Sequence, residues 1–308
     1  MGRFDHLATR PARGPRDILR WKVLDALAGK NRKDPGGFVT PRREPDRALI
    51  DGGAPQLTWI GHASFLLTMG GKRILVDPVF SKRLGPVSRL TAPGIALDAL
   101  PPIDVVLVTH NHRDHLDPWS LERLARGPGA PRFVVPLGNG DLIKSLGALE
   151  VTELDWWQST DLGSLEVTLV PARHWSMRYP WDRNDMLWGG FVIRSNEGVA
   201  YHSGDTAFFD GFAEIGKRLG KIDWAMLPIG AYEPRWFMEP QHMGPEEAVE
   251  AARRLDARHL VAMHWGTFKL TDEPIGEPPA RARAAFEQAA DADRALWILD
   301  VGETRRLG

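Results

Sequence analysis

The sequence predicts an α/β protein built as an αββα sandwich, in which two β-sheets lie face to face between layers of helices. Short apolar runs separated by Gly and Pro begin at Leu57 and are interspersed with helical segments. These runs and helices form two successive sets along the chain, as expected when each set supplies one sheet and its covering helices. The chain has 308 residues, of which 43% are hydrophobic, enough for the core of one large domain or two small ones.

The predicted strands are short apolar runs that end at turn residues. They cover Leu57–Ile60, Ser64–Thr68, Arg73–Val76, Asp104–Thr109, Arg132–Val135, Leu165–Val170, Gly190–Ile193, Val199–His202, Trp224–Leu227, His259–Met263 and Leu296–Leu299. Helical patterns predict helices near Pro118–Arg126, Asp141–Leu146, Phe208–Leu219, Pro245–Leu255 and Pro279–Ala290. Pro245 suits a helix start, and the two glutamates that follow it interact favourably with the positive end of the helix dipole.

Residues 1–54 form an N-terminal extension that is rich in Arg, Pro and Gly, and residues 55–308 form the folded domain. Apolar residues in Asp17–Leu27 recur with a period close to 3.6, which predicts one short helix. We expect this helix to pack on the domain. Because Arg16, Arg20 and Lys22 lie among its apolar residues, the alternative is a helix that rests on anionic lipid.

Composition excludes several classes of site and partner. There are no cysteines, so disulfides, thiolate metal sites and cysteine nucleophiles are excluded. Lys and Arg total 39 against 40 Asp and Glu, a balance that provides no basic surface for nucleic acid. The N-terminus lacks a signal-peptide apolar segment, and no run approaches the roughly 18 apolar residues of a membrane span. We expect a cytoplasmic protein, with peripheral contact at the inner membrane face left open.

The segment most informative about chemistry is VVLVTHNHRDHLDPWS, in which an apolar strand runs directly into four side chains that can bind metal. These are His110, His112, Asp114 and His115. In an extended stretch, residues two apart face the same way, so His110 and His112 can reach one ion. A turn would then direct Asp114 and His115 toward a second ion. Burying these groups together without a metal would be costly, and the segment therefore predicts a metal centre.

Three more apolar runs each end at one potential ligand: LEVTLVPARHW at His174, VAYHSGDT at Asp205 and HLVAMHWG at His264. The carboxyl ends of strands are where an open α/β sheet presents its sites, so these residues can converge although they are distant in sequence. A carboxylate such as Asp205 can bridge two cations and hold them about 3.5–4 Å apart, as two-metal hydrolases require.

These residues resemble the metallo-β-lactamase superfamily, whose HxHxDH motif is present as residues 110–115. The resemblance extends over nearly all of Leu57–Thr304 and implies the αββα metallo-β-lactamase fold for a hydrolase domain at residues 55–308. The segments TWIGHASFLL, PARHWSMR, SGDTAFF, PIGAYEPRWFM and MHWGTFKL are most similar to N-acylphosphatidylethanolamine-specific phospholipase D and its bacterial relatives. The PIGAYEPRWFM stretch discriminates best.

The resemblance implies two zinc ions and assigns a ligand set to each. His110, His112 and His174 would hold one zinc, Asp114, His115 and His264 the other, and Asp205 would bridge them. Manganese or iron could replace zinc, since two imidazoles with carboxylates suit those metals as well. The resemblance also suggests a homodimer.

Further residues are implied in catalysis and substrate binding. Asp114, in addition to its metal, and His242, beside the substrate phosphate, are the expected catalytic residues. His62 resembles a position that either supports the ligands or contacts substrate. Arg235 could pair with phosphate or with Glu233. The segments Trp236–Met238 and Trp181–Trp188 could line an acyl-accepting cleft, form a membrane-facing rim, or belong to the core.

The expected function is phospholipase D-type hydrolysis of N-acylphosphatidylethanolamine, or of a related phospholipid or small phosphodiester. A hydroxide bridging the metals would attack phosphorus, with an imidazolium at His242 stabilising charge or protonating the leaving group. One alternative is a lactonase or other carboxylic-ester hydrolase, similar to ascorbate-6-phosphate lactonase, because the same hydroxide attacks carbonyls. Another is a non-catalytic metal-dependent protein that binds its ligand without turnover.

Overall fold

The computed structural model describes residues 2–8 and 13–308. Within these residues the strands form two seven-stranded sheets and a two-stranded hairpin, β4 (Arg83–Leu84) with β5 (Val87–Ser88). The first sheet has the order β16 (Thr304–Arg306), β1 (Gln56–Gly61), β2 (Ser64–Met69), β3 (Lys72–Val76), β6 (Val105–Leu107), β7 (Arg132–Pro136) and β8 (Val151–Leu154). The second has the order β15 (Ala295–Trp297), β14 (Ala257–Met263), β13 (Ile222–Pro228), β12 (Gly198–His202), β11 (Gly190–Ser195), β10 (Glu166–Val170) and β9 (Ser159–Asp161).

Alternate residues of the first sheet face different parts of the core, because side chains on a strand point to opposite faces. Phe65 and Leu67 of β2 belong to the larger core cluster, which also contains Phe191 and Ile193 of β11 in the other sheet. Leu66, between them, belongs to a second cluster on the outer face of the first sheet. Full burial of side chains of this size contributes about 1.5–3 kcal/mol each. The sheets are thus held together by the residues between them.

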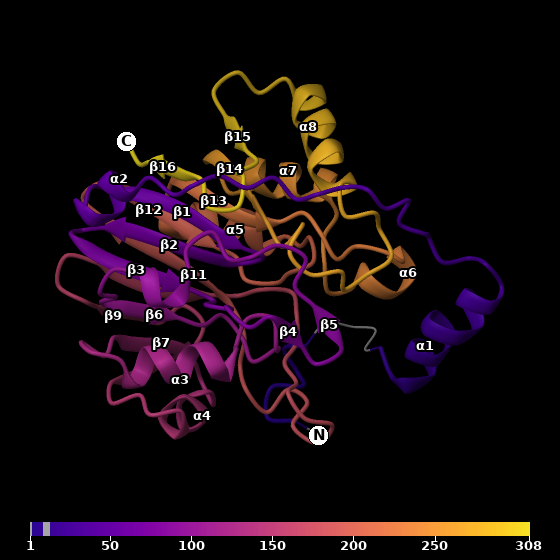
Figure 1. Ribbon diagram of the computed structural model, residues 1–308, viewed down its shortest axis with the longest axis horizontal. Helices are drawn as coiled ribbons and strands as arrows, with labels where there is room; N and C mark the ends of the chain where they lie inside the picture. The colour runs from indigo at the N-terminus through magenta and orange to yellow at the C-terminus, as the bar shows by residue number, and fades with distance from the viewer. Residues whose placement is uncertain (1, 9–12) are drawn as a thin grey trace.

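Helices cover both outer faces of this double sheet, as Figure 1 shows. The outer cluster of the first sheet includes residues of α2 (Arg47–Asp51), α3 (Pro118–Arg126) and α4 (Gly140–Ser145). Residues of α5 (Gly211–Leu219), α7 (Pro245–Arg254) and α8 (Glu277–Ala289) pack with the second sheet. The remaining helices are α1 (Pro15–Leu19), the π-helical η1 (Arg20–Asp25), the 3₁₀ turn η2 (Leu97–Ala99) and α6 (Arg235–Met238). This is an αββα sandwich, which confirms the predicted fold class.

Every predicted strand and helix is present, with ends shifted by a few residues. The elements that were not predicted are short or lie at sheet edges: β4, β5, β8, β9, β16, α2, η2 and α6. The extension, predicted to contain one helix, contains α2 in addition to the continuous helix α1–η1. None of the helices in the described residues is long and apolar enough to cross a membrane.

Strand direction determines which chain segments meet at one edge of the sandwich. In the first sheet β1, β3 and β6 run the same way, because β1 and β3 are both antiparallel to β2 and β3 is parallel to β6. In the second sheet β10, β12, β13 and β14 share one direction for the same reason. The loops after these strands carry the predicted ligands, so the carboxyl ends of several strands supply one site.

Candidate metal centre

Five histidines and two aspartates predicted as metal ligands lie together at the carboxyl ends of the strands. The loop after β6 carries His110, His112, Asp114 and His115, while His174, Asp205 and His264 follow β10, β12 and β14. The arrangement contains two groups whose ligand atoms lie within 4.8 Å of one another and that could each hold a metal ion. Both sheets therefore contribute to a single centre.

The first group consists of His110, His112, His174 and Asp205. Nδ1 of His112 lies 3.0 Å from Nε2 of His110 and 3.1 Å from Nε2 of His174. Oδ2 of Asp205 lies 3.9 Å from Nε2 of both His110 and His174. Three imidazole nitrogens and one carboxylate oxygen thus converge on one point, which is a donor set suited to zinc.

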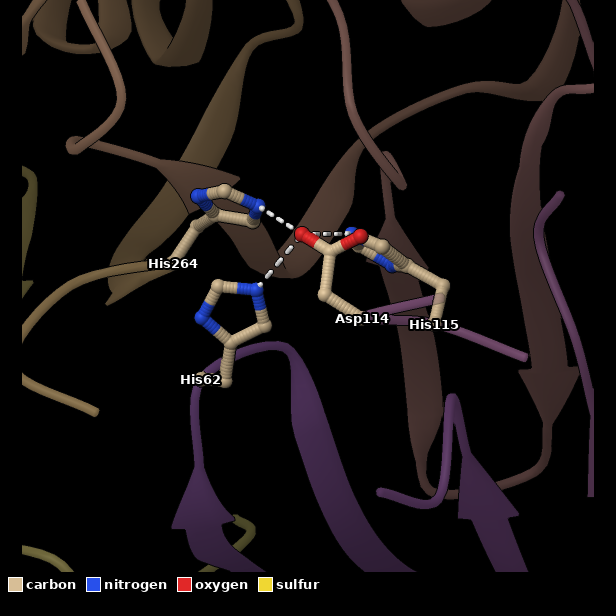
Figure 2. Close-up of side chains that lie close together, drawn as sticks. All are labelled: His62, Asp114, His115 and His264. Atoms are coloured by element: carbon tan, nitrogen blue, oxygen red, sulfur yellow. Dashed lines mark hydrogen bonds and ion pairs between the residues drawn. The ribbon is translucent and has the colours of Figure 1, made fainter. Parts of the chain in front are cut away.

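The second group consists of His62, Asp114, His115 and His264, so it contains one histidine that was not predicted as a ligand (Figure 2). Oδ2 of Asp114 lies 3.4 Å from Nε2 of His264 and 3.8 Å from Nε2 of His115. Figure 2 shows the imidazoles of His62 and His264 directed at this same oxygen. Nε2 of His62 is 3.1 Å from it. Asp114 therefore lies at the centre of the second group.

Asp205 lies between the two groups and presents one oxygen to each. Its Oδ2 faces His110 and His174, whereas its Oδ1 lies 3.2 Å from Nε2 of His115 and 3.1 Å from Nε2 of His264. A carboxylate so placed can be shared by two cations. This is the geometry on which the predicted bridging role depends.

Burial and the two carboxylates together determine the charge at the centre. Burial lowers the pKa of His112 to about 4 and that of His174 to about 3, so these imidazoles are neutral and offer lone pairs. Burial would also lower the pKa of His264, but Asp205 and Asp114 raise it to about 9. The same carboxylates, with Asp77, raise the pKa of the buried His115 well above its usual value. The second group therefore favours positive charge near the carboxylates, which two imidazole protons supply without a metal and a bound cation would supply in their place.

The chemistry of these residues fits divalent cations. Nε2 of His115, Nε2 of His264 and Oδ1 of Asp205 are buried and make no hydrogen bond of normal geometry with the described residues, yet they face one another. A cation placed among them would satisfy all three atoms, whereas burying them unsatisfied costs free energy. Neutral imidazoles on one side and buried carboxylates on the other are the donors that such ions use.

A second layer of hydrogen bonds orients the predicted ligands. Asp77, which follows β3, lies 2.6 Å from Nδ1 of His115 and also accepts hydrogen bonds from the backbone N–H and hydroxyl of Thr109. His174 lies with its Nδ1 3.0 Å from the carbonyl oxygen of Gln241. Such contacts fix the ring orientation of a metal ligand. Asp77 was not predicted, although its place after the apolar strand RILV, at the same edge as the motif, is a usable signal.

His242 lies at the rim of the centre, with Nε2 3.9 Å from Oδ2 of Asp205. It belongs to the loop between α6 and α7, and forms a third possible ligand group with Asp205 and His264. Burial lowers the pKa of His242 to about 3, in spite of the nearby carboxylate of Asp205. This environment disfavours the imidazolium expected from the sequence, because desolvation penalises the charged ring. A neutral His242 still has one N–H to donate.

Arg235 and Trp236, which were considered as substrate-binding residues, contact other residues of the chain. The guanidinium of Arg235 donates two hydrogen bonds to the carboxylate of Glu247, at 3.0 and 3.1 Å, and one to the carbonyl oxygen of His242. Glu233, one of the two partners considered from the sequence, instead accepts a hydrogen bond from the backbone N–H of Arg235. Trp236 lies beneath the guanidiniums of Arg13 and Arg20. Arg235 thus supports the loop that carries His242.

The tryptophans at the two ends of the segment Trp181–Trp188 have different environments. Trp188 is 1% exposed and belongs to the core, where its indole N–H donates to the carbonyl oxygen of Ala172. Trp181 is 78% exposed and stacks on Tyr179. The core interpretation therefore holds for Trp188, whereas Trp181 lies at the surface.

An αββα sandwich with buried His and Asp clusters at its strand ends defines a class of metal-dependent hydrolases. Residues 72–265 match the family model described as beta-lactamase superfamily domain. The chain belongs to the metallo-β-lactamase superfamily, as a metal-dependent hydrolase.

Individual relatives agree with this assignment. The chain is 35% identical to N-acyl-phosphatidylethanolamine-hydrolyzing phospholipase D 1 of Caenorhabditis elegans over 263 residues, which are 80% of this chain and 74% of that protein. It is 39% identical to an uncharacterized protein of Mycobacterium tuberculosis over 284 residues, 88% of this chain and 74% of the relative. The structure of Igni18, a metallo hydrolase from Ignicoccus hospitalis, shares the fold with a TM-score of 0.63 at 23% identity, covering 82% of this chain and 97% of that one.

Proposed function

We propose that this chain hydrolyses the phosphodiester of a phospholipid in the manner of a phospholipase D, with an N-acylphosphatidylethanolamine as the substrate class. The observation that carries the proposal is the position of Asp205, whose two oxygens each face one histidine group. Shared ligation of this kind suits hydrolysis assisted by two metals. The similarity to the nematode enzyme, which its name describes as hydrolysing this lipid, supports the choice of substrate.

In this proposal the ligand sets are those predicted from the sequence. His110, His112 and His174 hold one cation, Asp114, His115 and His264 hold the other, and Asp205 joins them. Zinc is the preferred metal, with manganese or iron as alternatives. Bound there, the two cations would supply hydroxide from water near neutral pH and neutralise charge on the phosphoryl oxygens.

The residues around the metal centre would contribute to the reaction by keeping the predicted ligands in a fixed orientation. Asp77 and the carbonyl of Gln241 hold the rings of His115 and His174, so little reorganisation is needed when substrate binds. A neutral His242 would donate a hydrogen bond to a phosphoryl oxygen. Water would cleave the bond between phosphorus and the ethanolamine oxygen, which would give phosphatidate and an N-acylethanolamine.

The test combines metal analysis with a substrate panel. Metal content would be measured by mass spectrometry on the purified chain, together with turnover of bis(p-nitrophenyl) phosphate, an N-acylphosphatidylethanolamine and a set of lactones. We expect two metals per chain and cleavage of both phosphodiesters. Opening of lactones alone would move the function to the rival class of ester hydrolases, and binding without turnover of any substrate would indicate a non-catalytic protein.

Two variants would separate ligation from catalysis. Asp205→Asn should abolish turnover and lower metal content, because the bridge loses its charge and one of its anionic oxygens. His242→Ala should slow turnover by roughly 10²–10³-fold while metal content stays at the wild-type level, the range for loss of one hydrogen-bond donor to developing charge. Full activity of the Asp205 variant with its metals bound would contradict the assignment, and loss of metal from the His242 variant would make that residue a ligand.

A further inference from the structure

The helix α1–η1 has an apolar surface that the described part of the chain leaves uncovered. Ile18, Leu19, Val23 and Leu24 of this helix, and Leu27 in the helical residues directly after η1, are between 42% and 83% exposed. Trp21 is buried against the domain, whereas Asp25, four residues later, is buried and pairs with Arg20 and Lys30 of the same segment. Figure 1 shows the helix projecting from the body of the molecule beside α6. A helix attached by one narrow face therefore presents most of its apolar residues outward.

The helix and the residue just before it contact segments that lie next to the candidate metal centre. The indole N–H of Trp21 donates to Asp272 at 2.6 Å, and its ring lies 4.9 Å from that of Phe237 in α6. Just before the helix, the carbonyl oxygen of Arg13 accepts a hydrogen bond from Arg183. Arg183 in turn covers Trp175, whose ring lies 4.7 Å from that of His112.

The charge of this segment is opposite in sign to that of the rest of the chain. Residues 13–33 contain seven Lys and Arg and two Asp, a net charge of +5, whereas the whole chain has a net charge of −1. The side chains of Arg20, Lys22 and Lys30 are 57%, 48% and 69% exposed, and each also forms a long ion pair: Arg20 and Lys30 with Asp25 at 3.8 and 4.0 Å, and Lys22 with Asp272 at 4.0 Å. Apolar residues flanked by exposed cations are typical of helices that lie in the interface of an anionic membrane.

We propose that α1–η1 docks the chain on an anionic lipid surface through these five apolar residues and the surrounding cations. The inference deepens the proposed function and rests on it for its purpose, since a phospholipid substrate is presented in a membrane. The apolar residues enter the lipid while Arg20, Lys22 and Lys30 contact the headgroups. The exposed Trp181, on the loop that also carries Arg183, is suited to the same interface.

Co-sedimentation of the full chain with vesicles tests the proposal. The vesicles contain either equal parts of phosphatidylglycerol and phosphatidylcholine or phosphatidylcholine alone. We expect binding to the anionic vesicles that weakens with salt, and much weaker binding to the neutral ones. Binding to neither kind, or equal binding to both, would overturn the proposal.

A double variant and a matched control locate the surface. Leu19→Asp with Leu24→Asp places two charges on the exposed face and should lower partitioning onto anionic vesicles by at least roughly tenfold. Leu149→Asp changes a leucine that is 85% exposed near β8 and should leave partitioning unchanged. Circular dichroism confirms that each variant is folded. The proposal would be overturned if the double variant bound vesicles as the wild type does. It would also be overturned if the wild type were a dimer and the double variant a monomer with unchanged vesicle binding, because the apolar face would then be a dimer interface.

Failure of this inference is distinguishable from failure of the proposed function. Hydrolysis of the phospholipid dispersed in detergent reports on the metal centre, because it does not require a membrane surface. If that hydrolysis is absent while the helix-dependent vesicle binding is present, the docking surface stands and the substrate assignment falls. If hydrolysis is present but vesicle binding does not depend on the helix, the docking surface falls alone.

Discussion

His62 directs its Nε2 at the same carboxylate oxygen of Asp114 that faces His264, so it is placed to orient this predicted ligand. Burial lowers the pKa of His62 to about 3, and the neutral ring must therefore carry its proton on Nε2 to donate to the carboxylate. Its backbone is also fixed, since its N–H donates to the hydroxyl of Thr267 and its carbonyl accepts from the backbone N–H of His264. The sequence left two roles open for His62, support of the ligands or contact with substrate, and these contacts favour support of a predicted ligand.

This arrangement predicts a graded response to substitution at His62. His62→Leu cannot donate to Asp114 and should weaken metal binding in the second group by about 10–100-fold, the usual effect of losing such support. His62→Gln places an amide N–H near the position of Nε2 and should recover most of that loss. Metal titration with a competing chelator gives the affinities. Equal affinity of the Leu variant and the wild type would show that Asp114 holds its position unaided.

At the scale of elements, the strands that were predictable differ physically from those that were not. β2 and β6 are apolar runs whose burial is evident from their own residues. β9 (sequence STD) and β16 (sequence TRR) lie at sheet edges, where pairing with a neighbouring strand defines the strand and the side chains provide little pattern. Such strands could not be identified by hydrophobic periodicity.

The candidate site shows the same division. The HxHxDH segment and the three single ligands were predictable because each follows an apolar strand, and the structure brings all seven residues together. Their roles as ligands stay predictions. The hydrogen bond from Arg235 to Glu247 was not predictable, because it joins α6 to α7 across a loop whose course depends on tertiary packing. Where a loop folds back on itself, sequence spacing does not indicate which charges meet.

Glu277, at the start of α8, ties the N-terminal segment to the domain. Its carboxylate accepts hydrogen bonds from Arg32 and from the hydroxyl of Tyr232, and Arg281 lies nearby. The hydrogen bond from Arg32 is the main cause that lowers the pKa of Glu277 from 4.5 to about 2, although partial burial opposes it. Since the pKa is lower in the folded chain, ionised Glu277 stabilises the fold above pH 4.5, and this contribution is lost as the pH falls toward about 2.

Removing this carboxylate should therefore change the acid sensitivity of the chain. Urea unfolding of the wild type, followed at several pH values between 4.5 and about 2, should show the free energy of unfolding falling with pH. Glu277→Gln should be less stable at pH 4.5 and should lose less stability across this window. A decline as steep as that of the wild type would mean that other groups account for the acid sensitivity, either other carboxylates or the buried histidines with a pKa of about 3 to 4, such as His112 and His174.

At the scale of the whole molecule, the candidate metal centre joins the two sheets. The predicted ligands after β6 belong to the first sheet, and those after β10, β12 and β14 belong to the second. Each ligand group draws on both sheets: His110 and His112 meet His174 and Asp205, while Asp114 and His115 meet His264. Bound cations would therefore link the layers at one edge of the sandwich, where buried imidazoles and carboxylates replace the apolar contacts found elsewhere between the sheets.

Metal removal should consequently weaken the fold as well as the proposed activity. A cation present at about 1,000 times its dissociation constant stabilises the folded state by about 4 kcal/mol, so two contribute about 8 kcal/mol, and stripping both should lower the unfolding midpoint by roughly 10 °C for a domain of this size. Scanning calorimetry before and after dialysis against a chelator measures the shift, and adding back zinc should restore it. Asp205→Asn, which lacks the bridging carboxylate, should show a smaller shift because it begins with less metal bound. An unchanged midpoint in the wild type would mean that the contacts between the sheets hold the sandwich together without the cations.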